Sequence, residues 1–268
     1  MFRVEQLLDE GASTGHVLGL DTATGVASLA LISHGRVIDK IDRAVASHSV
    51  SIPAIVDELV GNAGLSISEL NAIAVGIGPG SYTGLRIGLS YAKGLVLATG
   101  CSLVGVPSFD SIAIAARESG EVAPGASICV IFDARRGEVY AALYRVVADR
   151  LEKRSEESVV ALEHLASRIT GDTLFVGDSC ANDAAALVGR RGLGVAVLET
   201  GTLDLRGVCV AAIGAARLAH GEKDRGESLE PLYIRTPDST FRKTTRDPAA
   251  IATEGLWSSE RKKSSGGI

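Results

Sequence analysis

The sequence has few aromatic residues and no long apolar run. One Trp, five Tyr and five Phe occur in 268 residues, so a core of Ala, Val, Leu and Ile is expected and an aromatic-rich binding surface is not. The longest apolar run, 94–106, has 13 residues, fewer than the roughly 20 that a helix needs to cross a bilayer. The first ten residues contain acids where a signal peptide has its apolar stretch. We therefore expect neither a membrane segment nor export.

Cysteine is also scarce, and its positions are dispersed. The four cysteines lie at least 28 residues apart, with no Cys-x-x-Cys pair and no clustering with the five histidines. This spacing excludes a zinc knuckle and a redox dithiol. Reduced and buried thiols are expected, as in a cytoplasmic protein. The residues are Cys101, Cys129, Cys180 and Cys209.

Positive charge is in deficit over most of the chain. Lys and Arg number 27 against 32 Asp and Glu, which gives a net charge of −5. Without a global positive field, a stand-alone nucleic-acid-binding protein is disfavoured. The exception is 235–263, with seven basic and four acidic residues. Because periodicity is lost there and Ser, Thr, Lys and Gly gather, 236–268 is predicted to be a mobile tail.

What is present is an alternation of strand and helix patterns, typical of an α/β fold. The first half has the order strand, strand, strand, helix, strand, helix, strand, and the second half starts again in a similar way. We expect strands at 17–21, 26–32, 37–41, 72–77, 103–106, 128–133, 139–146, 174–177 and 195–198, and helices at 52–63, 83–99, 109–117, 181–189 and 208–220.

Two turns with the same spacing indicate an internal repeat. Asp21-x-x-x-Gly25 and Asp133-x-x-x-Gly137 each follow one strand and precede another, as a duplicated unit would leave them. Each copy must bury its own sheet face against helices, so two lobes are predicted. We place an N-terminal extension at 1–16, the first lobe at 17–106 plus about 204–235, and the second lobe at 107–203.

A glycine-rich turn lies between the strand at 72–77 and the helix at 83–99. Exposed backbone N–H groups in such a turn favour an anion, which makes Gly78, Gly80 and Ser81 weak candidates for phosphate binding. The segment has no P-loop Lys and misses the dinucleotide spacing by one residue. A structural turn that allows close helix packing is the favoured interpretation.

Other polar residues carry weaker signals. Asp21 could hold a metal ion, although a turn-capping role is commoner. His48 has no second ligand three to five residues away, so a loop or cap position is favoured. The segment 177–181 imitates a serine-hydrolase elbow but lacks the last glycine, and His220 is the one later histidine. The charged turn 133–138 is interpreted as solvated, or as a docking point for a phosphate or for acidic groups of a partner.

Five motifs in a fixed order make the assignment more specific. They are Leu18-Gly-Leu-Asp-Thr-Ala-Thr, Ser47-His-Ser-x-x-Ile-Pro53, Gly76-x-Gly-Pro-Gly-Ser-Tyr-Thr-Gly-Leu-Arg-Ile-Gly88, Asp133-Ala-Arg-Arg-Gly-Glu-Val-Tyr140 and Leu229-Glu-Pro-Leu-Tyr-Ile-Arg235. Together they resemble the TsaB (YeaZ) family over about 17–235. The resemblance implies the duplicated actin/sugar-kinase/Hsp70-like (RNase H-like) fold. It also implies a role in forming threonylcarbamoyladenosine at position 37 of tRNAs that read ANN codons.

The resemblance further implies that the chain is not the catalyst. In that family a paralogue, TsaD, transfers the threonylcarbamoyl group, TsaE is an ATPase, and TsaB is a dimerisation partner that pairs with itself when alone. ATP and Mg²⁺ would then be used by the complex, tRNA would be reached indirectly, and this chain would carry no catalytic residue, metal or cofactor. Ser108 and Ile112 stand where TsaD-type proteins have metal-binding histidines, and neither side chain can replace an imidazole ligand.

Two other functions stay open on the residues alone. A nucleotide phosphotransferase or ATPase of the same fold would need acidic Mg²⁺ ligands, for which Asp21 and Asp133 are the candidates. A metallopeptidase is the weaker third possibility, because the metal motif is missing.

A partner surface is expected on the helices at 52–63 and 83–99. The first has more apolar positions than one buried stripe needs, and glycines in the second would let another helix approach. The pair would form a platform for TsaD or for a second copy, unless these residues are all internal core. Arg86 could contact an anion or a partner, although a solvated arginine is commoner. The expected contact residues are His48, Ile52, Val56, Leu59, Gly84, Arg86 and Gly88.

Overall fold

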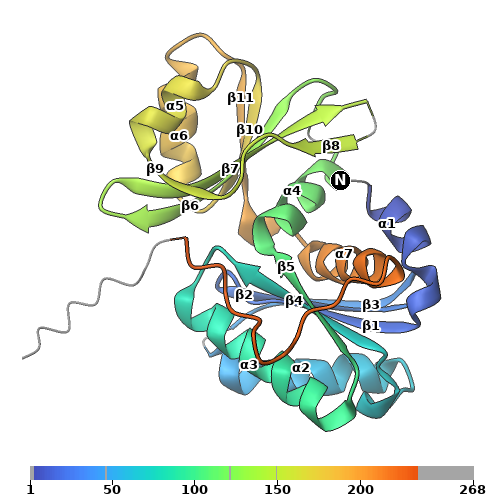
Figure 1. Cartoon of the computed structure of the whole chain (residues 1–268). Coiled ribbons are helices and arrows are strands. Elements are labelled where there is room, and N and C mark those ends of the chain that lie inside the picture. The colour runs from blue at the N-terminus through green and yellow to red at the C-terminus, as the bar shows by residue number, and fades with distance from the viewer. Residues whose placement is uncertain (1–2, 46, 121, 149, 235–268) are drawn as a thin grey trace, which may run out of the picture. The chain divides into compact units, whose positions relative to one another are not determined.

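A computed structural model describes residues 3–45, 47–120, 122–148 and 150–234. This part of the chain forms two mixed β-sheets with helices on their faces (Figure 1). The predicted tail at 236–268 lies outside the described residues. Among the described helices, none is both long enough and apolar enough to cross a membrane.

The first sheet joins an antiparallel meander to two parallel strands. Its order is β3-β2-β1-β4-β5, with β4 parallel to β1 and β5 parallel to β4. The strands are β1 (His16–Asp21), β2 (Val26–Ser33), β3 (Arg36–Ala44), β4 (Ala72–Gly78) and β5 (Ser102–Pro107), and the helices of this half are α2 (His48–Asn62) and α3 (Tyr82–Thr99).

The second sheet repeats this arrangement. Its order is β11-β10-β6-β7-β8, and β9 also pairs with β7. The β6–β7 hairpin corresponds to β1–β2, and the parallel strands β10 and β11 correspond to β4 and β5, which confirms the predicted duplication. The elements are β6 (Ser127–Arg135), β7 (Glu138–Val147), β8 (Arg150–Lys153), β9 (Ser158–Ala161), α5 (Leu162–Arg168), β10 (Thr173–Gly177), α6 (Cys180–Gly189) and β11 (Val195–Glu199).

Helices α4 (Ser108–Glu118) and α7 (Arg206–Ala219) lie between the sheets, whereas α2 and α3 cover the outer face of the first sheet and α5 and α6 that of the second (Figure 1). Phe109 and Ile112 of α4 pack in one core with Cys209 and Ala212 of α7. Most side chains of both helices are buried, as expected for helices that are apolar on nearly every side. The exact lobe boundaries stay a prediction.

The N-terminal residues are part of the fold, which corrects their assignment as an extension. Helix α1 (Val4–Glu10) packs against α7. Leu7 is buried in the core between the sheets. Gly11 lies so close to α7 that a β-carbon on it would come within 2.5 Å of Ala215 Cβ. His16, the last residue of the predicted extension, is the first residue of β1.

Candidate functional site

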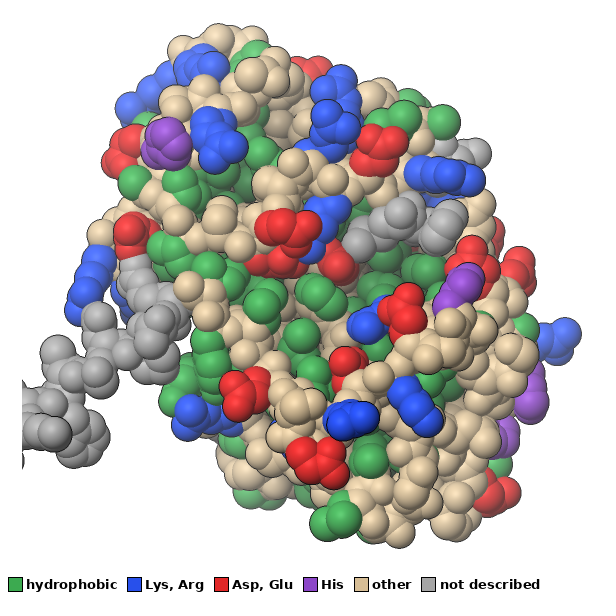
Figure 2. Space-filling model, viewed as in Figure 1, with side chains coloured by type: hydrophobic (Ala, Val, Ile, Leu, Met, Phe, Trp, Pro, Cys, Tyr) green, Lys and Arg blue, Asp and Glu red, His purple; other side chains and the backbone are tan. Residues whose placement is uncertain are grey.

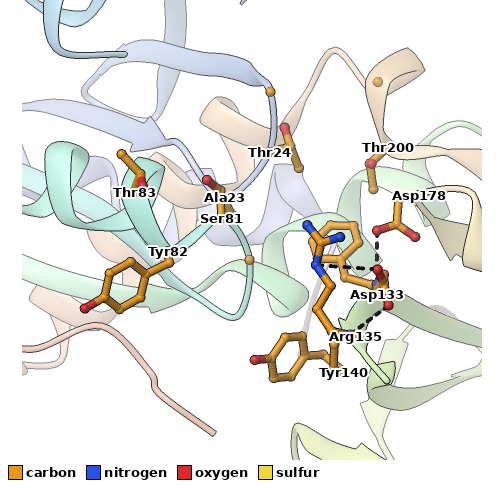
Figure 3. Close-up of a pocket in the computed structure, with 15 residues that line it drawn as sticks. Ala23, Thr24, Ser81, Tyr82, Thr83, Asp133, Arg135, Tyr140, Asp178 and Thr200 are labelled. Carbon is orange, nitrogen blue, oxygen red and sulfur yellow. Dashed lines mark hydrogen bonds and ion pairs between the residues drawn. The ribbon is translucent and has the colours of Figure 1, made fainter. Parts of the chain in front are cut away.

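A cavity of about 620 Å³, called here the central pocket, opens between the two sheets (Figure 3). Residues 23–25 of the β1–β2 turn and 132–135 of the β6–β7 hairpin line it from opposite sides. The two repeated turns therefore meet at one site. The other lining residues are 80–83, Tyr140, Asp178 and 200–201.

The glycine-rich turn before α3 is packed tightly against the β1–β2 turn. The Ser81 N–H donates to the Ala23 carbonyl at 2.7 Å, and a β-carbon on Gly80 would lie 2.4 Å from that oxygen. Ser81 Oγ caps α3 by accepting from the Gly84 N–H at 3.2 Å. The Gly78 N–H donates to Ser108 Oγ at 3.1 Å. Internal contacts thus account for this motif, and of the three phosphate candidates Gly80 and Ser81 line the central pocket while Gly78 does not.

A buried ion pair holds the β1–β2 turn from beneath. Arg206, at the start of α7, lies 3.3 Å from Asp21 Oδ1, and neither side chain is exposed to solvent. Arg206 also donates to Thr24 Oγ1 at 2.9 Å and to the Val26 carbonyl at 3.2 Å. Asp21 is therefore neutralised inside the chain, and it does not line the central pocket.

The carboxylates in the central pocket cap the backbone around them. Asp178 accepts hydrogen bonds from the N–H groups of Asp133 at 3.0 Å and Cys180 at 3.1 Å. Asp133 accepts from the N–H of Arg135 at 2.8 Å, and its other oxygen lies 3.8 Å from Arg135 Nε (Figure 3). In the described part of the chain, no three His, Cys, Asp or Glu side chains are grouped to hold a metal ion.

The apolar positions of α2 face the core, which corrects their assignment to a partner surface. Ile52, Val56 and Leu59 are fully buried. They pack with side chains of the first sheet, among them Leu29 and Val75. A partner protein cannot reach these three residues while the sheet is folded, so this part of the predicted surface is wrong.

Two of the glycines of α3, Gly84 and Gly88, also face inward. A β-carbon on Gly84 would lie 2.2 Å from the Thr22 carbonyl oxygen, and one on Gly88 would lie 2.3 Å from Thr22 Oγ1. The Thr22 hydroxyl donates to the Gly84 carbonyl at 2.8 Å. These glycines let α3 approach the β1–β2 turn and do not receive a partner helix. The expectation that both contact a partner is therefore corrected as well.

The outer side of α2 and α3, called here the α2–α3 face, carries different residues. Leu97 is 90% exposed and Val50 is 75% exposed. Arg86 is exposed, in keeping with its predicted position on a surface. His48 is half-buried, and its Nε2 lies 3.1 Å from the Thr24 carbonyl oxygen. Six residues define the α2–α3 face: Val50, Ala54, Tyr82, Arg86, Ser90 and Leu97.

Comparison with known proteins decides the family. Residues 42–201 match the family model described as TsaD: tRNA N6-adenosine threonylcarbamoyltransferase. The tRNA threonylcarbamoyladenosine biosynthesis protein TsaB of Escherichia coli is 31% identical over 224 residues, which is 82% of this chain and 94% of that protein. This chain belongs to the TsaB family.

Further TsaB relatives and solved structures agree. TsaB of Bacillus subtilis is 34% identical over 139 residues, covering 51% of this chain and 58% of that protein. The crystal structure of YeaZ from Pseudomonas aeruginosa, at 24% identity, superposes with a TM-score of 0.65 over 82% of this chain and 99% of that chain. The chain thus has the TsaB/YeaZ fold, which is the duplicated actin/sugar-kinase/Hsp70-like fold that the motifs implied.

Two buried positions of α4 bear on the expected absence of a metal site. From the sequence resemblance we expect Ser108 and Ile112 to stand at the positions where TsaD-type proteins have metal-binding histidines. Both are fully buried; Ser108 Oγ accepts the Gly78 N–H and Ile112 lies in the core between the sheets. Here the two positions serve packing and hydrogen bonding.

Three buried cysteines and the serine of the hydrolase-like segment are possible nucleophiles in the described chain. Burial raises the pKa of Cys129 to about 12 and also raises the pKa values of Cys180 and Cys209, so their thiolates are disfavoured. Ser179 directly precedes α6 with helical dihedral angles. His220 follows α7, and its Nδ1 lies 2.7 Å from the Ala216 carbonyl oxygen.

Sequence reasoning identified both repeated turns but missed Arg206. Its partner Asp21 lies 185 positions away in the chain, and an arginine at the start of a helix carries no local signal of burial. The next residue, Gly207, packs against β2, because a β-carbon on it would lie 2.7 Å from the backbone of Leu29. This contact can be recognised only in the three-dimensional structure.

Proposed function

We propose that this chain is a non-catalytic subunit in the formation of threonylcarbamoyladenosine at position 37 of ANN-decoding tRNAs. The Asp21–Arg206 pair carries the non-catalytic part of the proposal, because it neutralises the acid that the repeated turn would offer to a cation. Asp133 and Asp178 are engaged by backbone N–H groups. The reaction would take place in the cytoplasm, as the family resemblance implies.

The chain would act by binding a TsaD-type paralogue, with TsaE as the ATPase of the complex. The proposed contact is the α2–α3 face, where Leu97 and Val50 expose apolar side chains that nothing in the described chain covers. When the paralogue is absent, a second copy would occupy the same face. ATP and Mg²⁺ would be used by the complex, and tRNA would be held mainly by the other subunits.

Reconstitution tests this proposal. Purified TsaD-type paralogue, TsaE, ATP, threonylcarbamoyl-adenylate and tRNA are combined with and without this chain, and modified adenosine is measured by mass spectrometry of digested tRNA. We expect product when the chain and the paralogue are both present, and none from the chain with threonylcarbamoyl-adenylate alone. Modified tRNA from this chain without the paralogue would refute the non-catalytic assignment.

A nucleotide phosphotransferase or ATPase is the second candidate. The observation in its favour is the central pocket itself, about 620 Å³ in volume and lined by both repeated turns. Incubation of the purified chain with Mg²⁺ and ATP distinguishes the two functions. Multiple turnovers by the chain alone would favour the phosphotransferase, and their absence favours the scaffold.

A further inference from the structure

A segment that follows α7 returns across the first sheet to α3. Residues 221–234, called here the C-terminal strap, run beside β5 and β4 before reaching the helix (Figure 1). The Asp224 N–H donates to the Leu103 carbonyl at 2.8 Å, and the Leu232 N–H donates to the Ile77 carbonyl at 2.7 Å. The strap is therefore anchored by backbone hydrogen bonds near both of its ends.

Side-chain contacts anchor the strap as well. Asp224 Oδ2 accepts the Gly105 N–H at 2.8 Å. Leu229 packs over Gly105, whose missing β-carbon leaves the space for its methyl group. These contacts fix the path of the strap and bring Tyr233 to the exposed side of α3.

Tyr233 completes a stack around Arg86. Arg86 Nε donates to Tyr233 Oη at 2.8 Å. Its guanidinium carbon lies 4.1 Å from the centroid of the Tyr82 ring and 5.8 Å from that of Tyr233. The two tyrosine rings are 5.6 Å apart. Tyr82 and Arg86 share a helix face because they are four residues apart.

This stack fixes the orientation of an exposed cation. The cation–π contact with Tyr82 and the hydrogen bond that Nε donates to Tyr233 restrain the long side chain of Arg86. Less conformational entropy is therefore lost when Arg86 binds another group. Among the described residues, no carboxylate forms an ion pair with Arg86. Its two terminal nitrogens present the planar edge that a carboxylate oxygen pair matches.

We propose that Arg86, held by Tyr82 and Tyr233, is the anchoring contact of the α2–α3 face and binds a carboxylate of the partner protein. The inference deepens the proposed function and rests on it. It also makes the C-terminal strap part of the docking surface. A central Arg flanked by Tyr is the kind of group that carries most of the binding energy in protein interfaces.

The surroundings of Arg86 favour a protein over a nucleic acid. Leu97 lies 11 residues further along α3, about three helical turns, and therefore on the same face. An RNA surface gathers several cations to neutralise successive phosphates, whereas α3 carries two, Arg86 and Lys93, together with the exposed apolar side chain of Leu97. Lys, Arg, Asp and Glu side chains are interspersed on the face of the molecule in Figure 2, with no field of one sign.

The test measures binding of the TsaD-type paralogue to the full chain by isothermal titration calorimetry. Arg86→Lys keeps the charge but loses the planar fork, and we expect about tenfold weaker binding. Tyr233→Phe keeps the ring but loses the hydroxyl that accepts the hydrogen bond from Arg86, and we expect a smaller loss of affinity for the paralogue. Arg168→Lys, an exposed arginine of α5, is the matched control and should bind like the wild type. Thermal melts check that each variant is folded.

The outcomes separate this inference from the function on which it rests. If the wild type and Arg86→Lys bind the paralogue equally, the anchoring role is wrong while the scaffold function stands. If the wild type does not bind the paralogue, both are wrong. If Arg86→Lys weakens binding of labelled tRNA to the chain but not of the paralogue, the ligand of Arg86 is a phosphate and the proposal is overturned.

Discussion

Two buried charges beneath the central pocket determine how the β1–β2 turn is held. Arg206 has Asp21, Thr24 and the Val26 carbonyl as partners within the chain. Removing one member of such a pair leaves the other charge buried without compensation, which is far more costly than losing an exposed pair. The same pair balances the charge of Asp21, one of the two candidate cation ligands, through Oδ1, while Oδ2 is buried and has no hydrogen-bond partner among the described residues. The stability of the turn and the proposed lack of catalysis therefore share one cause.

Replacement of Arg206 tests this account. We expect Arg206→Met to lower the free energy of unfolding by roughly 3–5 kcal/mol, measured by urea denaturation. Lys40→Met is the control, because Lys40 pairs with Asp204 at 2.7 Å where the two side chains are 35% and 71% exposed, and its loss should be about 1 kcal/mol or less. Equal losses of unfolding free energy in the two variants would show that the buried pair contributes no more to stability than the more exposed pair.

Thiol reactivity gives a second prediction for single residues. Cys129 is fully buried with a pKa of about 12, whereas Cys101 is partly exposed. A raised pKa keeps the thiol protonated, and the thiolate is the reactive form. At pH 8, iodoacetamide should modify Cys101 in the folded chain and reach the other three cysteines after unfolding. Peptide mass spectrometry checks this, and rapid modification of Cys129 in the native state would contradict the packing.

At the scale of elements, the glycines of α3 divide into two kinds. Gly84 and Gly88 are buried against Thr22, whereas Gly94 has open space around its α-carbon. The sequence showed three small residues in one helix but could not show which side faced the sheet. The glycine motif of the family therefore shapes the approach of α3 to the β1–β2 turn, and through it one wall of the central pocket.

Alanine substitution separates the two kinds of glycine. Gly84→Ala should destabilise the chain by about 1–3 kcal/mol, since the added methyl group meets the Thr22 carbonyl. Gly94→Ala, in the same helix, should stabilise it by up to about 1 kcal/mol through helix propensity. Thermal melts followed by circular dichroism compare the two. A stabilised Gly84→Ala variant would contradict the close contact.

The longer elements and several short strands were predicted from the sequence, whereas four short elements were missed. Apolar runs bounded by turns identified β1, β2 and β6, and α3 was placed within one residue of its start. Helices α1 and α5 and strands β8 and β9 were not predicted, because each is short and without clear periodicity. These elements are stabilised by contacts with other segments, such as those between α1 and α7, which are distant in the sequence. Such contacts cannot be predicted from the local sequence.

At the scale of the whole molecule, the duplication was predictable because it repeats a local spacing. The two Asp-x-x-x-Gly turns were read from the sequence, and the structure brings both to the central pocket. The orientation of α2 was not predictable in the same way. Its apolar residues exceed one stripe, and only the sheet packed on them shows that Ile52, Val56 and Leu59 are core.

The central claim is that the α2–α3 face binds a TsaD-type paralogue, and a titration of that paralogue into the chain tests it most directly. Leu97→Glu places a charge on the most exposed apolar residue of α3, where it would be desolvated on binding. Val195→Glu, on β11 of the second sheet and 38% exposed, is the matched control. The account predicts saturable binding of the wild type and of Val195→Glu, and about tenfold or weaker binding of folded Leu97→Glu. A folded Leu97→Glu variant that binds as tightly as the wild type would contradict it.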